Sequence, residues 1–142
     1  MAGSHVPAVV DAAVDALRLD STLAGQLTAA KIYTHVPQGT DPPYAWVLGG
    51  EELPWAMAFG DDAGFRQVDL MVTVVSTYRG TVEVDELGSL VLDVLLEDAA
   101  WSNLVGYAQV EFVRNTALPP TDLLTDGVMW FLRTIVVRVF VS

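Results

Sequence analysis

An apolar residue at nearly every second position marks the C-terminal part of the chain, and the longest such run spans residues 127–141. The run is rich in β-branched and aromatic residues and contains no proline, which favours a pleated, well-packed surface. Its odd positions from Met129 to Val141 are apolar, broken only by Arg133. We therefore predict a strand packed on a core. At ~3.3 Å per residue it would be about 45–50 Å long, against a domain diameter of roughly 37 Å, so it should bend, bulge or overhang.

Three shorter segments also predict strands. Phe65–Tyr78 alternates with a valine- and leucine-rich face, as a half-buried antiparallel strand does. Tyr44–Leu48 follows Pro43, where a missing N–H does least harm. Tyr107–Asn115 is predicted as a further strand. Its inward-facing residues are expected to be Ala108, Val110 and Phe112.

A period near 3.6 residues predicts helices elsewhere. Val6–Leu17 carries its apolar residues at helical spacing, with Pro7 in the first turn, where proline is tolerated. Asp20 is expected to cap a second, short helix that reaches Leu27. Thr81–Asp98 predicts the longest helix.

The wheel of the Thr81–Asp98 helix shows two features besides its main apolar face. Four carboxylates fall in a wedge about 80° wide. This acidic stripe consists of Glu83, Glu86, Asp93 and Glu97. Leu92 and Leu96 form a second apolar edge, which predicts that the helix packs on its sheet and on something else.

These elements together predict an α+β fold in a single domain over residues 1–142. Amphipathic helices set among alternating strands indicate a mostly antiparallel sheet of four or five strands. The two main helices, Val6–Leu17 and Thr81–Asp98, should pack on one face of that sheet. A chain of this length can bury close to 70% of its unfolded surface without disulfides.

Composition adds an expectation of self-association. The chain is 52% hydrophobic with a mean hydropathy of +0.41, which is high for a monomer. No apolar stretch approaches the ~20 residues of a membrane-spanning helix, and the N-terminus lacks a signal-peptide pattern. We therefore expect no membrane contact, and we expect the surplus apolar surface to lie between subunits.

Charge and cysteine content narrow the functional classes. The net charge is −11 with one lysine, Lys31, so the chain should repel nucleic-acid phosphates rather than bind specific sequences. The absence of cysteine excludes disulfides and thiolate metal sites and fits a reducing compartment.

Candidate chemistry is sparse. The carboxylate pairs Glu51-Glu52 and Asp61-Asp62 could serve acid–base or metal chemistry, although a solvated loop is the favoured interpretation. His35 has no acid cluster at ligand spacing around it. None of the common nucleophile, phosphate-binding or zinc motifs occurs. We therefore expect no catalytic, cofactor or metal residues and no enzyme activity.

The segment Gly49–Gly64 is interpreted as a long loop that docks a partner. Between its acidic pairs it carries Trp55, Met57 and Phe59, an arrangement of aromatic anchors and charged rim that is typical of interfaces.

The chain resembles the tail-terminator (tail-completion) family of long-tailed bacteriophages. The residues that carry the resemblance are the helix Val9–Leu17, the run Lys31–Gly39 and Pro43-Tyr44, followed by the same order of later elements. The resemblance implies a non-enzymatic α+β subunit of the virion tail, assembled in the host cytoplasm. It also implies a hexameric ring that caps the tail tube, contacts the tail tube protein and the head connector proteins, and lets DNA pass without specific binding.

Two functional hypotheses follow. In the first, the chain is a ring-forming tail terminator, and the acidic stripe lines the channel, where it would keep passing DNA from adhering. In the alternative, it is a small-molecule-binding or enzymatic α+β domain with a site near His35 and the acidic loop. A convergent polar cluster would favour the alternative, and the sequence predicts none.

Overall fold

One twisted sheet of five strands organises the part of the chain that this computed structural model describes, residues 4–54, 66–77, 81–118 and 130–142. In chain order the elements are α1 (Val6–Leu19), α2 (Ser21–Ala24), the 3-10 helix η1 (Ala29–Lys31), β1 (Ile32–Tyr33), β2 (Tyr44–Pro54), β3 (Arg66–Ser76), α3 (Thr81–Leu95), the 3-10 helix η3 (Asp98–Trp101), β4 (Tyr107–Ala117) and β5 (Phe131–Val141). The strand order is β1-β2-β3-β5-β4, and only the short β1–β2 pair is parallel.

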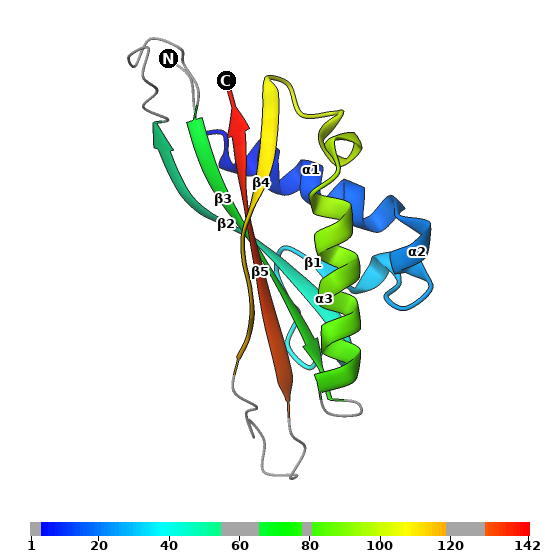
Figure 1. Cartoon of the computed structure of the whole chain (residues 1–142). Coiled ribbons are helices and arrows are strands. Elements are labelled where there is room, and N and C mark those ends of the chain that lie inside the picture. Colours follow the sequence, from blue (N-terminus) through cyan, green and yellow to red (C-terminus); the bar gives the residue numbers. More distant parts are fainter. Residues whose placement is uncertain (1–3, 55–65, 78–80, 119–129) are drawn as a thin grey trace.

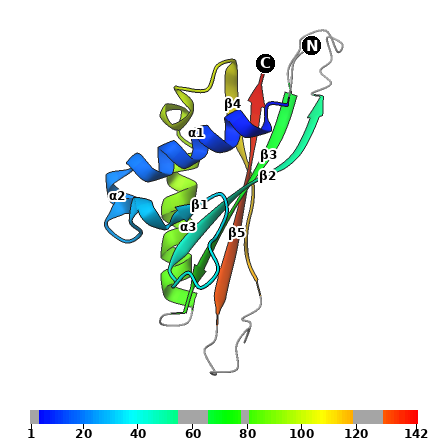
Figure 2. The same cartoon turned by 180° about the vertical axis from the view of Figure 1, so that it is seen from behind.

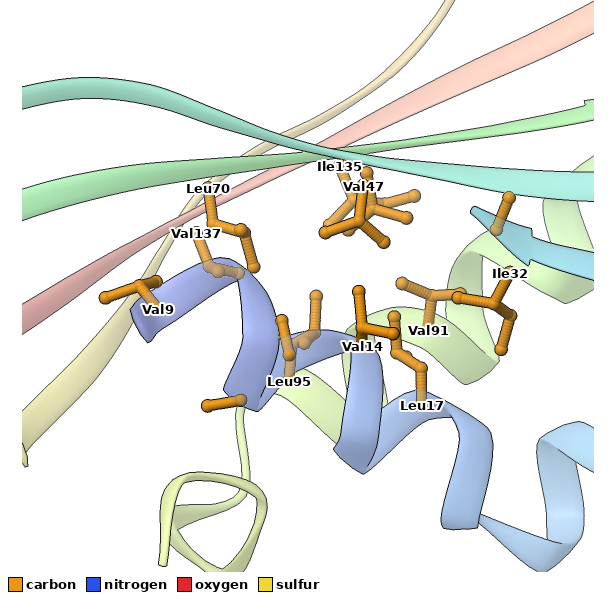
Figure 3. Close-up of a cluster of buried hydrophobic side chains, with 14 of the residues drawn as sticks. Val9, Val14, Leu17, Ile32, Val47, Leu70, Val91, Leu95, Ile135 and Val137 are labelled. Atoms are coloured by element: carbon orange, nitrogen blue, oxygen red, sulfur yellow. The ribbon is translucent and has the colours of Figure 1, made fainter. Parts of the chain in front are cut away.

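Both main helices pack against the sheet on one face, which confirms the predicted α+β architecture. Figures 1 and 2 show α1 and α3 crossing each other on that side. The core between them is formed by apolar side chains from both layers (Figure 3). Its fully buried members include Val9 and Leu17 of α1, Val91 and Leu95 of α3, and Val47, Leu70, Ile135 and Val137 of the strands.

Strand β5 is an interior strand of this sheet because it pairs with both β3 and β4. Its predicted apolar face is confirmed, with Ile135 and Val137 fully buried. The opposite face is also buried at Val136, which stands between the longer Met71 of β3 and Arg114 of β4. The strand begins at Phe131, and residues 127–129 of the predicted run lie outside the described residues.

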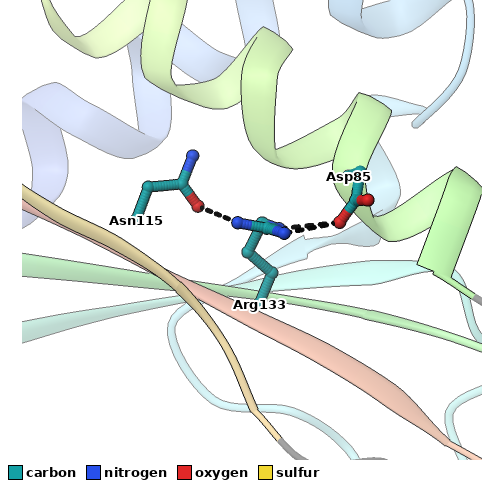
Figure 4. Close-up of polar contacts among 3 residues, drawn as sticks. All are labelled: Asp85, Asn115 and Arg133. Carbon is teal, nitrogen blue, oxygen red and sulfur yellow. Dashed lines mark hydrogen bonds and ion pairs between the residues drawn. The ribbon is translucent and has the colours of Figure 1, made fainter.

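Arg133, the one break in the apolar face of β5, is accommodated by α3. Its guanidinium donates hydrogen bonds to Asp85 at 2.9 and 2.6 Å and to the Asn115 side-chain oxygen at 2.8 Å (Figure 4). The helix can approach because residue 88 is glycine. A Cβ there would lie 2.6 Å from Cδ of Arg133.

The prediction that Gly49–Gly64 is entirely loop was wrong for its first part. Strand β2 continues to Pro54, with a register shift between Gly49 and Glu52. The two glycines that suggested a loop are needed because the backbone is approached closely there. A Cβ on Gly49 would lie 2.1 Å from Val6 Cγ1, and one on Gly50 would lie 2.9 Å from the Asp69 carbonyl oxygen.

The predicted inward face of β4 was also wrong. Ala108 is exposed, Phe112 is 50% exposed, and only Val110 packs partly against the core. Strand β4 lies at the sheet edge, and register shifts between Tyr107 and Gln109 and between Phe112 and Arg114 break its alternation.

The helix ends differ from the predicted ones by a few residues. Helix α3 ends at Leu95 rather than Asp98, where the fully buried Trp101 donates its indole N–H to the Leu95 carbonyl at 2.9 Å. Asp20 caps α2 as predicted, accepting from the Leu23 backbone N–H at 2.8 Å. That helix is shorter than predicted and ends at Ala24.

Candidate functional site

The docking residues Trp55, Met57 and Phe59 lie outside the described residues, as do Asp61 and Asp62. What the structure describes of the segment 49–64 is strand up to Pro54. The structural evidence for an assembly surface therefore comes from the helices and from the sheet edge.

The four carboxylates of the acidic stripe, on α3 and just beyond its end, differ in their exposure to solvent. Glu86, Asp93 and Glu97 are exposed. Glu83 is half-buried, and its carboxylate accepts a hydrogen bond from the Ser76 hydroxyl at 2.5 Å. The exposed stripe therefore has three carboxylates, and residues 81–104 contain no lysine or arginine.

The second apolar edge of the helix is only partly available. Leu92 is half-buried and packs against the core, whereas Leu96 is 39% exposed just beyond the end of α3. Leu96 is therefore the member of this pair that offers apolar surface to another molecule.

The described residues of the alternative site do not form a metal-binding cluster. His35 and Glu51 are both exposed, and no group of three potential metal ligands occurs in the described ranges. Glu52 is engaged elsewhere, accepting from the Ser4 hydroxyl at 2.7 Å and the His5 backbone N–H at 3.0 Å. Burial would raise the pKa of Glu52, but these two hydrogen bonds, together with electrostatic attraction from His5 and Arg66, outweigh it and lower the pKa.

Two adjoining hollows lie along helix α1, and we call them together the α1 groove. Their volumes are about 250 and 450 Å³, and Ala12, Asp15 and Asn103 line both. Leu19 lines one hollow and is 81% exposed, while Val105 lines the other and is 89% exposed. These are the highest exposures among the large apolar residues of the described chain.

Sequence reasoning did not identify this groove. Leu19 lies past the predicted end of its helix at Leu17, and Val105 lies in a connection with no periodic pattern. An isolated apolar residue in such a place is common on protein surfaces, so only the fold reveals that these two residues border one groove.

Charge is divided unevenly between the two layers. The α3–η3 segment, residues 81–104, has six carboxylates and no cation, whereas strands β2 to β5 carry four carboxylates and four arginines. The strand arginines are Arg66, Arg114, Arg133 and Arg138. The molecule is therefore strongly acidic on part of its helical side and close to neutral along the sheet.

No helix in the described part of the chain is both long and apolar enough to cross a bilayer. A search of curated proteins finds no match. Among solved structures, the chain is similar to a chain in the structure titled "Virion of native gene transfer agent (GTA) particle". The two share 19% identity with a TM-score of 0.67, covering 99% of this chain and 100% of the other, and at this identity the likeness concerns the fold.

A family model described as Tail completion protein gp17 matches residues 8–136. This span includes most of α1, all of α3 and the first half of β5. The match covers nearly the whole chain, which therefore belongs to the tail completion protein gp17 family and is a non-enzymatic structural component of the virion tail of a phage-like particle.

Proposed function

We propose that the chain assembles with copies of itself into a hexameric ring that closes the tail tube and joins it to the head connector. Membership in a tail completion family is the observation that carries this proposal. Large apolar residues exposed on separate elements support it, because surplus apolar surface commonly marks contacts between proteins. Leu19, Leu96 and Phe112 are examples on three different elements or their ends.

Within such a ring, the exposed stripe carboxylates Glu86, Asp93 and Glu97 would face the channel or its rim. Carboxylates there would repel the phosphates of passing DNA, whereas each cation would add affinity by releasing counterions. The absence of any cation between residues 81 and 104 supports this placement. The segment around Trp55, Met57 and Phe59 would dock on the tail tube protein or on a connector protein.

The mass of the purified protein in solution, followed by electron microscopy, tests the ring. We expect a concentration-dependent species of six subunits and ring-shaped particles with an open centre. A strictly dimeric or open filamentous assembly would contradict the proposal. A second test uses tails assembled without this chain, which should fail to join heads until the purified protein is added.

A further inference from the structure

The α1 groove is an apolar channel with an acidic rim. Ala12 and Ala16 of α1 are among the residues that line the smaller hollow. Asp15 lines both hollows, Glu97 lines the smaller one, and no lysine or arginine is among the described residues that line either.

The chemistry of the groove specifies its occupant. Apolar walls favour a large apolar side chain, and an acidic rim favours a cation beside it. On a chain of net charge −11, most surfaces of a second copy would be repelled by this rim. The matching surface must therefore combine an exposed apolar residue with an uncommitted cation.

Most cations in the described part of the chain are already engaged. Arg133 and Arg138 form ion pairs with Asp85 and Asp69. The remaining cations of the helical side donate to backbone carbonyls, Arg18 to Ile32 and Lys31 to Asp41.

Two exposed arginines remain among the described residues, and they differ in their surroundings. Arg66 lies close enough to Glu52 to stabilise that carboxylate electrostatically. Arg114 has no hydrogen-bond or ion-pair partner among the described residues. Arg114 is therefore the uncommitted cation.

Arg114 lies next to an exposed aromatic residue on the edge strand. Phe112, two positions earlier on β4, is 50% exposed. The register shift between them places Phe112 opposite Val137 and Arg114 opposite Val136, on opposite sides of the sheet. The two side chains therefore straddle the free edge of β4, and an edge that enters a groove presents one to each wall.

We propose that the β4 edge of one copy, with Phe112 and Arg114, docks in the α1 groove of a second copy. Phe112 would contact Val105 on the wall opposite α1, and Arg114 would pair with the carboxylate of Asp15 on α1. The two surfaces are different parts of the molecule, so the contact is head-to-tail and can repeat around a closed ring. This inference rests on the proposed function, because it assigns the subunit interface of that ring.

Disulfide trapping tests the contact directly, because the chain has no cysteine of its own. Val105→Cys and Phe112→Cys variants are purified separately, mixed under oxidising conditions and examined for a disulfide-linked heterodimer. The matched control mixes Val105→Cys with Val82→Cys, since Val82 is 55% exposed on α3 and lies outside both surfaces. We expect at least tenfold more heterodimer from the first mixture. Equal yields from the two mixtures would overturn the inference.

A charge exchange provides the second test and separates misfolding from a lost contact. Arg114→Glu and Asp15→Arg should each raise the dissociation constant of the oligomer at least tenfold, while the double variant should return it to within about threefold of wild type. Arg66→Glu is the control and should change the constant less than threefold. Failure of the double variant to recover assembly, with far-ultraviolet circular dichroism unchanged, would contradict the assignment.

The two proposals fail in different ways. Sixfold rings without the Val105–Phe112 crosslink would support the proposed ring and rule out this interface. A crosslink formed by a species that is not a closed ring would support the interface and contradict the ring.

Discussion

At the scale of single residues, Gly88 and Arg133 show how the core admits a charge. The arginine stem passes under α3 only because position 88 lacks a Cβ, and its guanidinium is held by Asp85 and Asn115. An arginine in an otherwise apolar strand face is thus compatible with the fold through one small residue and two polar partners. The sequence showed the break in the pattern but not the partners, which come from α3 and β4.

Gly88→Ala should destabilise the wild-type protein. Overpacking costs about 1–3 kcal/mol and outweighs the roughly 0.5–1 kcal/mol by which alanine is favoured over glycine in a helix. With Arg133→Ala as the background, the same change should become stabilising, because the clash with the arginine stem is gone. Urea unfolding of the four proteins measures this reversal, and the same sign in both backgrounds would disprove the account.

Glu52 should make stability depend on acid pH. Its pKa is lowered in the folded protein, so its contribution is present above the ordinary glutamate pKa and is lost as the pH falls through the lowered value. We expect Glu52→Gln to cost about 0.5–1 kcal/mol at neutral pH, as for a carboxylate near a helix N-terminus, and almost nothing near pH 3. Ser4→Ala, which keeps the carboxylate, should retain most of this pH dependence. A constant difference between wild type and Glu52→Gln from pH 7 to pH 3 would contradict the assignment.

At the scale of elements, patterns along the chain predicted what each segment contributes to the core but not how its neighbours shape it. The apolar face of β5 and the amphipathic character of α1 and α3 followed from periodicity alone, because burial on one side imposes it. The extension of β2 through Gly49 and Gly50 did not, since these glycines indicate a turn unless the approach of α1 is known. The exposure of Phe112 was missed because register shifts in an edge strand leave no periodic signal.

The exposed acidic stripe should control how assembly responds to salt. If Glu86, Asp93 and Glu97 converge on a channel, their mutual repulsion is screened as salt rises, over ~8–10 Å at physiological ionic strength. Glu86→Gln, Asp93→Asn and Glu97→Gln together should then tighten the oligomer on the order of tenfold at low salt, since each like-charge pair costs a few tenths of a kcal/mol and the pairs recur around a ring. The gain over wild type should shrink at high salt.

A matched variant controls for net charge in that experiment. Asp41→Asn, Glu51→Gln and Asp98→Asn remove the same number of exposed carboxylates from outside the stripe. Sedimentation velocity at low and high salt compares the three proteins. An identical salt response in the two triple variants would show that total charge matters and that the stripe does not line a channel.

At the scale of the whole molecule, the uneven distribution of charge suits the helical side and the sheet to different contacts. The α3–η3 segment, with carboxylates and no cation, suits a wall that faces a polyanion, whereas the sheet with balanced charges can approach another protein without repulsion. In the proposed assembly, a single small domain would offer an acidic channel wall on α3 and a self-contact at the β4 edge.

The docking surface is tested in whole particles. Replacing Trp55 and Phe59 with alanine should leave unfolding and ring formation unchanged but lower the yield of joined particles at least tenfold, because aromatic anchors carry most of the energy of an interface. The control is Leu118→Ala, which removes an apolar side chain that is 41% exposed elsewhere. Normal infectivity or packaging with the double alanine variant would rule out the docking role.

The position of β5 between β3 and β4 has a consequence for how the molecule folds. β5 follows β3 and β4 in the chain but lies between them, so the sheet cannot be built by adding strands in order. Its pairing with β3 joins residues as distant as Arg66 and Val141, and such non-local pairing makes folding slow. We expect Val137→Ala to slow refolding more than Val14→Ala of α1 does for an equal loss of stability, which stopped-flow chevron plots would show. Until β5 arrives, β3 and β4 each have an unpaired edge, and newly made chains in that interval are the ones most exposed to aggregation.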